Sequence, residues 1–402
     1  MEPKIRLKGF SGEWETTTLG DIASFSKGHN YSKSDIRNSG TPIILYGRLY
    51  TKYSPIIENV DTFVIPKDGS VFSKGGEVII PASGETPEDI SIASCVKGEG
   101  VILGGDLNVL TFDSSKYDPS FMAMAISSGK THKELSSYAQ GKTIVHLHND
   151  DIAKGHISFP CLKEQLSIVD YTTSLDSQIK ASTSSLASLK QIKAASLQAM
   201  FPQEGETVPK VRFKGFTGEW RKKKFSELYE RSMIKNDLSF GKDKIISVAN
   251  MYFIKSERNV DEEYLKSYNI MRVGDVAFEG NKSKHYAHGR LVENTIGDGI
   301  VSHVFVVMKP ISKQYDLDFW KYYINNEDIM GKKLVRCTKS STMMTDIVID
   351  DFLKESILVP SYEEQVEIGK ILSSLDNQIT LQSQRLEKLK QIKAACLDKM
   401  FV

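Results

Sequence analysis

Cysteine is scarce in this 402-residue chain, and its four cysteines lie far apart without forming a CxxC pair: Cys95, Cys161, Cys337 and Cys396. A disulfide-framed domain or a zinc site needs cysteines at short, regular spacing. The wide spacing here therefore argues against both a disulfide framework and a zinc site. The pattern is typical of reduced thiols, and it predicts a cytoplasmic protein.

Long hydrophobic runs are also missing. No stretch approaches the roughly 20 apolar residues that a membrane helix requires. The first ten residues, MEPKIRLKGF, lack the apolar segment of a signal peptide, so we expect no membrane association. The formal net charge is only +1, which means that composition alone does not indicate a nucleic-acid partner, although local basic patches remain possible.

Catalytic motifs are absent as well. Gly129-Lys-Thr and Gly141-Lys-Thr resemble the end of a phosphate-binding loop, but the glycine required five residues earlier is replaced by Met124 and Ser136. No dinucleotide-binding glycine motif, adenosylmethionine loop or GxSxG element occurs. His146 and His148, followed by Asp150 and Asp151, form a lone HxH with carboxylates, which is more typical of a surface strand and turn than of a metal site. We therefore expect a non-catalytic chain without a metal or cofactor of its own.

What the sequence does contain is an internal duplication. The segment PKIRLKGFSGEW at 3–14 returns as PKVRFKGFTGEW at 209–220, with nine of twelve positions identical. Residues 157–202 return as 357–402 with 21 of 46 positions identical, including the block KQIKAA at 190–195 and 390–395. The segments between these matched ends differ strongly, so the pattern indicates one frame that carries two divergent inserts.

Short β-type runs bounded by turn residues recur in both inserts, which predicts a mixed α/β fold. Examples are 77–80 and 108–112 in the first half, and 244–249 and 299–308 in the second. Gly76-Glu-Val and Gly274-Asp-Val occupy matching places, as do Gly100-Val-Ile and Gly299-Ile-Val. The two halves are therefore expected to share one fold with different loops.

The C-terminal part of each half predicts a long helix. Following Pro160 and Pro360, apolar residues recur at steps of three, four and seven, the spacing of a helix seam. The main seam residues are Leu175, Ile179, Leu186 and Leu189 in the first copy and Leu375, Ile379, Leu386 and Leu389 in the second. An unbroken helix of about 38 residues spans about 57 Å.

Such a narrow seam needs a partner, and the other copy packed antiparallel is the simplest one. The alternative is that each helix packs only on its own domain. The predicted fold class is thus α/β (α+β): two similar mixed α/β domains separated by two long antiparallel coiled-coil helices, with an internal pseudo-twofold repeat.

This plan resembles the specificity subunit of type I restriction-modification systems. The resemblance rests on the KGFxGEW entry, on Pro160 with Glu164-Gln165, on Pro360 with Glu364-Gln365, and on the two KQIKAA blocks. It covers the whole chain. It implies target-recognition domains at 1–158 and 204–358, with spacer helices at 159–203 and 359–402.

The resemblance also implies the partners. Each recognition domain would read one half of a bipartite, asymmetric site in double-stranded DNA, and the helices would set the spacer and dock two methyltransferase subunits. Restriction/translocase subunits would join for cleavage. Adenosylmethionine and ATP would be bound by those partners, so the chain itself is expected to hold no cofactor and no metal.

Reading DNA requires hydrogen-bonding and basic side chains on firm loops. Such residues follow predicted strands at matching places in both halves. The first-half candidates are Tyr46, Arg48, Tyr50, Lys52, Ser83, Thr86, Lys142 and Thr143. The second-half candidates are Asn250, Tyr252, Lys255, Asn281, Lys282, Lys284, His285, Lys339, Ser340 and Ser341. Trp14 and Trp220 are expected to anchor the entry segments in the core instead.

A different class of function remains open at this point. A duplicated scaffold or adaptor whose variable domains bind protein or glycan would also suit a nearly neutral chain. Binding to mixed-sequence DNA that weakens as salt rises would separate the two, because phosphate contacts release counterions.

Overall fold

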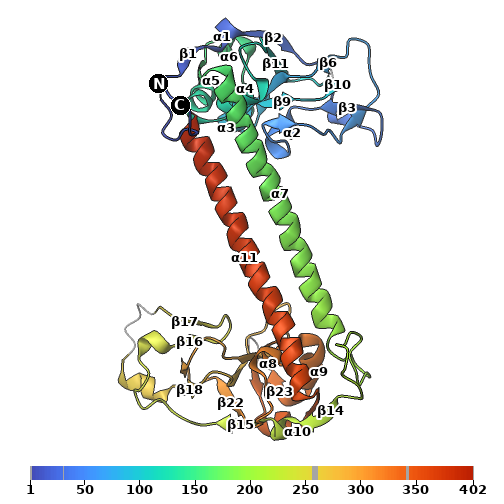
Figure 1. Cartoon of the computed structure of the whole chain (residues 1–402), viewed down its shortest axis with the longest axis vertical. Coiled ribbons are helices and arrows are strands. Elements are labelled where there is room, and N and C mark those ends of the chain that lie inside the picture. The colour runs from blue at the N-terminus through green and yellow to red at the C-terminus, as the bar shows by residue number, and fades with distance from the viewer. Residues whose placement is uncertain (1, 30, 256–260, 341–343, 402) are drawn as a thin grey trace. The chain divides into compact units, whose positions relative to one another are not determined.

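The computed structural model describes residues 2–29, 31–255, 261–340 and 344–401, and these form two compact units. The first unit comprises residues 1–183 together with 384–402, and the second comprises residues 184–383. Both units contain part of each long helix, α7 (Leu162–Ala199) and α11 (Tyr362–Met400) (Figure 1). The helix lengths of 38 and 39 residues confirm the predicted unbroken helices.

The first unit combines a five-stranded sheet, a four-stranded sheet and two strand pairs with short helices. Its strands are β1 (Glu15–Thr18), β2 (Ala23–Lys27), β3 (Thr41–Ile44), β4 (Ile56–Ile57), β5 (Phe63–Val64), β6 (Phe72–Lys74), β7 (Glu77–Pro81), β8 (Ser83–Gly84), β9 (Ser94–Val96), β10 (Glu99–Leu103), β11 (Leu107–Phe112), β12 (Val145–His146) and β13 (His156–Phe159). Its helices besides α7 are α1 (Leu19–Ile22), α2 (Gly47–Thr51), α3 (Pro87–Ile90), α4 (Pro119–Ile126), α5 (Gly129–Tyr138) and α6 (Asn149–Ile152), with a 3-10 turn at Lys33–Asp35.

The second unit has smaller sheets. Its strands are β14 (Arg221–Lys224), β15 (Tyr229–Ser232), β16 (Ile246–Ser247), β17 (Tyr252–Phe253), β18 (Asn269–Met271), β19 (Val276–Glu279), β20 (Arg290–Glu293), β21 (Gly299–Val301), β22 (Val306–Pro310), β23 (Thr338–Ser340), β24 (Thr345–Ile347) and β25 (Ser356–Val359). Its helices besides α11 are α8 (Leu317–Tyr323), α9 (Glu327–Cys337) and α10 (Ile349–Lys354), with 3-10 turns at Phe225–Glu227, Lys242–Lys244 and Glu263–Ser267.

The same frame underlies both units. A strand order of β2-β11-β7-β9 in the first unit is matched by β15-β22-β19-β20 in the second, and the pair β1-β13 is matched by β14-β25. Helices α4 and α5 take the places of α8 and α9 along the chain. The additions differ, since the first unit alone carries the sheet β5-β3-β10-β6 among the described residues. The expectation of one fold with different loops is confirmed.

Most predicted strands form where expected, but two runs in the second half differ. The run 299–308 divides into β21 and β22, because a turn closed by the Phe305 amide on the Ser302 carbonyl (3.0 Å) redirects the chain. This lets β21 pair with β18 and β22 with β15 and β19. Of the run 244–249, only Ile246–Ser247 is a strand, since the chain turns at once to pair with β17.

Buried polar contacts fix the start of each long helix. Arg6 of the first entry segment donates two hydrogen bonds, of 2.8 and 2.7 Å, to the Glu164 carboxylate. Arg212 of the second entry segment donates two hydrogen bonds of 2.7 Å to the Glu364 carboxylate. Both glutamates are 1% exposed. The neighbouring Gln165 accepts from the Asp118 amide (2.8 Å) and donates to the carbonyl of Pro160. Gln365 does the same with the Asp316 amide and the Pro360 carbonyl. The duplicated Glu-Gln motif thus ties each helix to its own domain.

The other end of each long helix holds an entry segment. In the first unit the Ile5 amide donates to the carbonyl of Lys399 near the end of α11. In the second unit the Val211 amide donates to the carbonyl of Ala199 at the end of α7. Both chain termini therefore lie in the first unit (Figure 1).

Within each unit the two helices run antiparallel and contact each other. In the first unit Asp176 pairs with Lys393 (2.5 Å), and Tyr171 lies near Cys396. Residue numbers therefore rise along one helix in the direction in which they fall along the other. In the second unit Lys193 pairs with Asp376 (2.5 Å). The predicted antiparallel partnership of the two helices is confirmed within each unit. Each helix also packs on its own domain, but the alternative that it packs only there is wrong.

The seam residues are buried to different degrees. Leu175 and Leu386 are 5% and 8% exposed, whereas the remaining seam residues are half-buried: Ile179, Leu186, Leu189, Leu375, Ile379 and Leu389. Two helices alone cannot cover a seam fully, which accounts for this exposure.

Each unit closes its core around aromatic side chains. Trp14 and Trp220 are both 3% exposed and meet Phe121 and Phe319 edge-on, which confirms them as anchors of the entry segments.

In the part of the chain that the structure describes, no helix has the length and apolarity to cross a membrane.

Candidate nucleic-acid interface

In the second unit, two of the predicted reading segments meet directly. The Thr345 amide and hydroxyl both donate to the carbonyl of Gly280 at 2.9 Å, and Asn281 forms a β-bridge with Met344. A Cβ added to Gly280 would lie 2.1 Å from the Thr345 oxygen, so only glycine allows this approach. The loop after β19 is therefore seated against the hairpin of β23 and β24.

The loop from 281 to 285 is an accessible basic segment of this region. All five residues are exposed: Asn281, Lys282, Ser283, Lys284 and His285. The loop is shaped by two contacts between Ser283 and Tyr286, one through the Ser283 amide and one through its hydroxyl. Among the described residues, no carboxylate pairs with Lys284, which leaves its ammonium available to a phosphate.

Asn250 lies at the tip of a tight hairpin between β16 and β17. Ser247 and Tyr252 are paired across this hairpin, and Met251 takes a left-handed conformation with φ of 49°. Asn250, Tyr252 and Lys255 are exposed, with Tyr252 at 52%. Amide, aromatic and cationic groups are therefore displayed together on one hairpin.

The last predicted segment of the second half is described in part. Lys339 is exposed on β23, opposite Asp346 of β24. Ser340 is the final residue of that strand. Ser341 lies outside the described residues.

In the first unit, two predicted segments also meet. Ser83 of β8 pairs with His146 of β12, and Gln140 exchanges two backbone hydrogen bonds with His146. These bonds close a small loop that leaves Lys142 and Thr143 exposed at its tip. Ser83 itself is 5% exposed and donates to Asp106 at 3.3 Å, so it supports this loop from beneath.

The aromatic and basic segment after β3 forms the short helix α2 instead of the predicted loop. The Tyr50 ring lies against Gly84, 3.6 Å from the place of an added Cβ, which brings α2 beside β8. Thr86 caps α3 by accepting from the Asp89 amide. Three of the first-half segments are therefore contiguous.

Arg48 and Lys52 share one carboxylate. Both pair with Asp61, and the Lys52 hydrogen bond and the nearby Arg48 lower the pKa of that carboxyl. Their charge is thus partly balanced within the unit. Direct contact with phosphate by Arg48 or Lys52 remains a prediction, and it would compete with Asp61.

A polar hollow of about 630 Å³ adjoins Tyr46. Lys27, Lys67 and Asp106 line it, and the Lys67 ammonium lies 4.9 Å from the centre of the Tyr31 ring. Sequence reasoning missed these residues, because they come from separate segments of the chain and no motif connects them. Only the spatial arrangement of the sheet ends identifies them as neighbours of the predicted segments.

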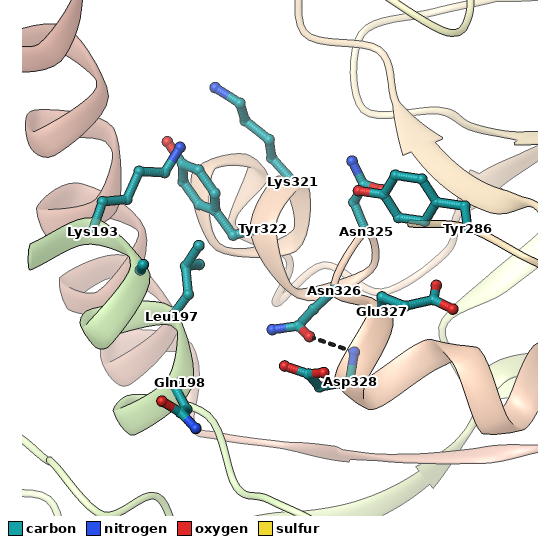
Figure 2. A pocket seen from close by; sticks show the side chains of 11 residues that line it. Lys193, Leu197, Gln198, Tyr286, Lys321, Tyr322, Asn325, Asn326, Glu327 and Asp328 are labelled. Atoms are coloured by element: carbon teal, nitrogen blue, oxygen red, sulfur yellow. Dashed lines mark hydrogen bonds between the residues drawn. The ribbon is translucent and has the colours of Figure 1, made fainter. Parts of the chain in front are cut away.

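The second unit has a comparable hollow of about 610 Å³ between α7 and α8–α9 (Figure 2). Lys193 and Leu197 of α7 face Lys321 and Tyr322 of α8 across it, and Tyr286 lies at its edge (Figure 2). Tyr322 donates to Asp376, the partner of Lys193. Burial raises the pKa of Asp376, but the hydrogen bonds from Lys193 and Tyr322 outweigh this, so the pKa lies below its usual value.

We expect Lys284→Ala to weaken DNA binding about threefold to tenfold and to lower the salt slope of binding by about one. The physical reason is the loss of one exposed cation that no carboxylate of the described chain neutralises. Titration of duplex DNA at several salt concentrations measures both quantities. Lys354→Ala is the control, because Lys354 pairs with Asp351 on α10. Equal affinity and slope for Lys284→Ala and the unchanged chain would contradict the assignment.

Glu293, the last residue of β20, is a buried acid. It is 3% exposed and accepts from the Tyr315 hydroxyl at 2.8 Å, while its Oε1 has no hydrogen-bond partner within the described structure. Burial raises the pKa of Glu293 to about 9. The carboxyl is therefore neutral in the folded chain at neutral pH.

The pKa of Glu293 is higher in the folded chain than in the unfolded chain. The contribution of Glu293 to the free energy of unfolding is therefore fully present below the unfolded pKa, and it is lost as the pH rises toward the folded pKa. Within this window the loss is about 1.4 kcal/mol per pH unit. We expect the melting temperature to fall between pH 5 and 9, and Glu293→Gln to flatten that slope. Glu230→Gln, at an exposed residue paired with Lys309, is the control. An unchanged slope in Glu293→Gln would refute the titration of this group.

The comparisons agree with the duplicated plan. The model of the type I restriction modification DNA specificity domain matches twice, at residues 11–191 and 217–391. These two segments make up most of the chain, so the chain belongs to this family of specificity proteins.

Solved structures show the same fold. The crystal structure of the S subunit of a type I restriction-modification system from M. genitalium matches with a TM-score of 0.58 and 15% identity, over 100% of this chain and 99% of that one. The HsdS subunit from Thermoanaerobacter tengcongensis matches with a TM-score of 0.50 and 15% identity, over 97% and 96%. At such low identity the likeness concerns the fold alone.

Proposed function

We propose that this chain is the DNA-specificity subunit of a type I restriction-modification complex. Residues 1–158 and 204–358 each read one half of a bipartite, asymmetric DNA site. The observation that carries this proposal is the pairing of one repeated frame with two unlike sets of loops. A repeated frame presents its loops to the two half-sites in equivalent ways, and unlike loops select different bases.

The exposed groups in these loops suit this task. Asn250, Asn281 and Lys284 are hydrogen-bonding or basic side chains of the types that contact base edges and phosphates. Tyr252 adds an exposed ring beside them. The loops are braced by backbone contacts such as that of Gly280 with Thr345, which reduces the ordering cost on binding.

The helical segments 159–203 and 359–402 are assigned the spacer function. In this proposal they set the number of unread base pairs and present a surface to two methyltransferase subunits, which bring adenosylmethionine. Restriction/translocase subunits, which use ATP, complete the complex in the cytoplasm. The chain itself is non-catalytic and contributes recognition. The half-exposed seam of α7 and α11 supports the docking assignment, because it offers apolar area to a partner.

Methylation-site sequencing of host DNA tests the proposal. The expected result is a bipartite motif with an unread spacer, methylated only when this chain is present. Exchanging residues 204–358 for the matching segment of another family member should change one half of the motif and leave the other half intact. A change in both halves would contradict independent reading. Absence of any motif that depends on the chain, together with binding to protein or glycan, would favour an adaptor instead.

A further inference from the structure

One half-buried guanidinium contacts two of the reading loops in the second unit. Arg290 begins β20, directly opposite Glu279 at the end of β19. Its Nε donates to Glu279 Oε2 at 3.1 Å, and its Nη2 donates to the carbonyl of Ala249. The Tyr286 ring covers the guanidinium, with 4.8 Å between its centre and Cζ.

These contacts reach the residues that we assign to DNA reading. Ala249 directly precedes Asn250 in the hairpin of β16 and β17, so the bond to its carbonyl orients the peptide that leads into Asn250. Tyr286 closes the basic loop 281–285 through its contacts with Ser283. Arg290 therefore connects two loops that are more than 30 residues apart in sequence to the rigid β19-β20 pair.

The surroundings indicate a positioning role in place of direct DNA contact. The Arg290 side chain is 20% exposed and that of Glu279 is 6% exposed. Two of the guanidinium donors already bond to a carboxylate and a carbonyl, and an aromatic ring lies against one face. A planar fork with several donors can hold all three partners at once, whereas a lysine ammonium is a single point of contact.

The described residues of the first unit form no such connection. Aligning the strands on Gly76 and Gly274 places Pro81 and Ile92 at the positions of Glu279 and Arg290. Neither side chain can form an ion pair. The Arg290 connection is thus specific to the second recognition domain.

We propose that Arg290 is a positioning residue that sets base preference in the second half-site, by holding the Asn250 hairpin and the 281–286 loop in register. The inference rests on the proposed function. It adds a residue that contacts no DNA to the set that determines sequence specificity. Sequence reasoning did not identify it, since β20 was not predicted and only the pairing of β19 with β20 places Arg290 opposite Glu279.

The test compares the methylated sites in hosts that carry the complex with the unchanged chain, with Arg290→Met or with Arg290→Lys. For both variants we expect methylation of sites with one altered base in the second half to rise at least tenfold relative to the cognate site. Sites altered in the first half should keep their low level. Arg290→Lys keeps the positive charge, so a residue that acted through its charge on phosphate would be rescued by lysine.

Three results would overturn the inference: an unchanged preference in both variants, full rescue by lysine, or an equal loss of methylation at all sites. The last would indicate a phosphate contact or a loss of folded protein. Lys354→Ala serves as the control and should retain the unchanged preference. If the unchanged chain directs no bipartite motif, the proposed function itself fails, and that outcome is distinct from the other three.

Discussion

Arg212→Met is expected to lower the melting temperature of the chain markedly. Arg212 gives two hydrogen bonds to Glu364, whose side chain is 1% exposed. Removing the cation leaves a buried carboxylate without its partner, which costs about 3 kcal/mol or more. For a unit of this size, that corresponds to a fall of about 6–12 °C.

Thermal unfolding followed by circular dichroism measures this effect. The double variant Arg212→Met with Glu364→Met should recover much of the loss, because no buried charge remains. Lys210→Met is a matched control, since Lys210 is exposed and its contact with Glu206 is long, at 4.0 Å. A fall as small as that of the control would show that the pair does not anchor α11. Arg6 and Glu164 should behave in the same way in the first unit, because their geometry is nearly the same.

Gly280→Ala is expected to abolish recognition of the second half-site. The added Cβ would lie 2.1 Å from the Thr345 oxygen and 3.2 Å from its carbon, and both atoms belong to the backbone. The loop after β19 and the β23-β24 hairpin must then separate, which breaks two hydrogen bonds and the bridge of Asn281 with Met344. Overpacking of this kind costs about 1–3 kcal/mol.

Site selection from a duplex library measures the outcome, and preference at the first half-site should persist. Gly241→Ala is the control in the same unit, because its Cβ would meet only the end of the Asp243 side chain, at 3.1 Å. Retention of second-half preference in Gly280→Ala would refute the assignment of these two segments to one reading surface.

Much of the frame was predictable from the residues, because it depends on local patterns. The apolar spacing after Pro160 and Pro360 specifies two long helices, and the structure contains them as α7 and α11. The duplicated entry segments predicted buried tryptophans, and Trp14 and Trp220 are buried. Repetition within one chain also predicted that the two units share one fold, and their matching strand orders confirm it.

The candidate site was predictable only as a set of segments. Asn281, Lys284 and Lys142 are exposed on loops, as reading residues require. Ser83 is buried, and Arg48 and Lys52 are paired with Asp61, a residue that no sequence pattern singled out. Whether a basic side chain is exposed or neutralised depends on partners from elsewhere in the chain, and residue type does not specify them.

By itself, the sequence determined that the chain is a duplicated frame with helical ends, unlike inserts and no catalytic motif. Periodicity and repetition are properties of neighbouring residues and of the two copies, so they can be read without coordinates. Only the tertiary structure decided that Gly280 lies against Thr345 and that Arg290 joins Glu279 to the Ala249 carbonyl. These contacts follow from strand register and close packing between distant segments, and a shift of one residue in register would remove them.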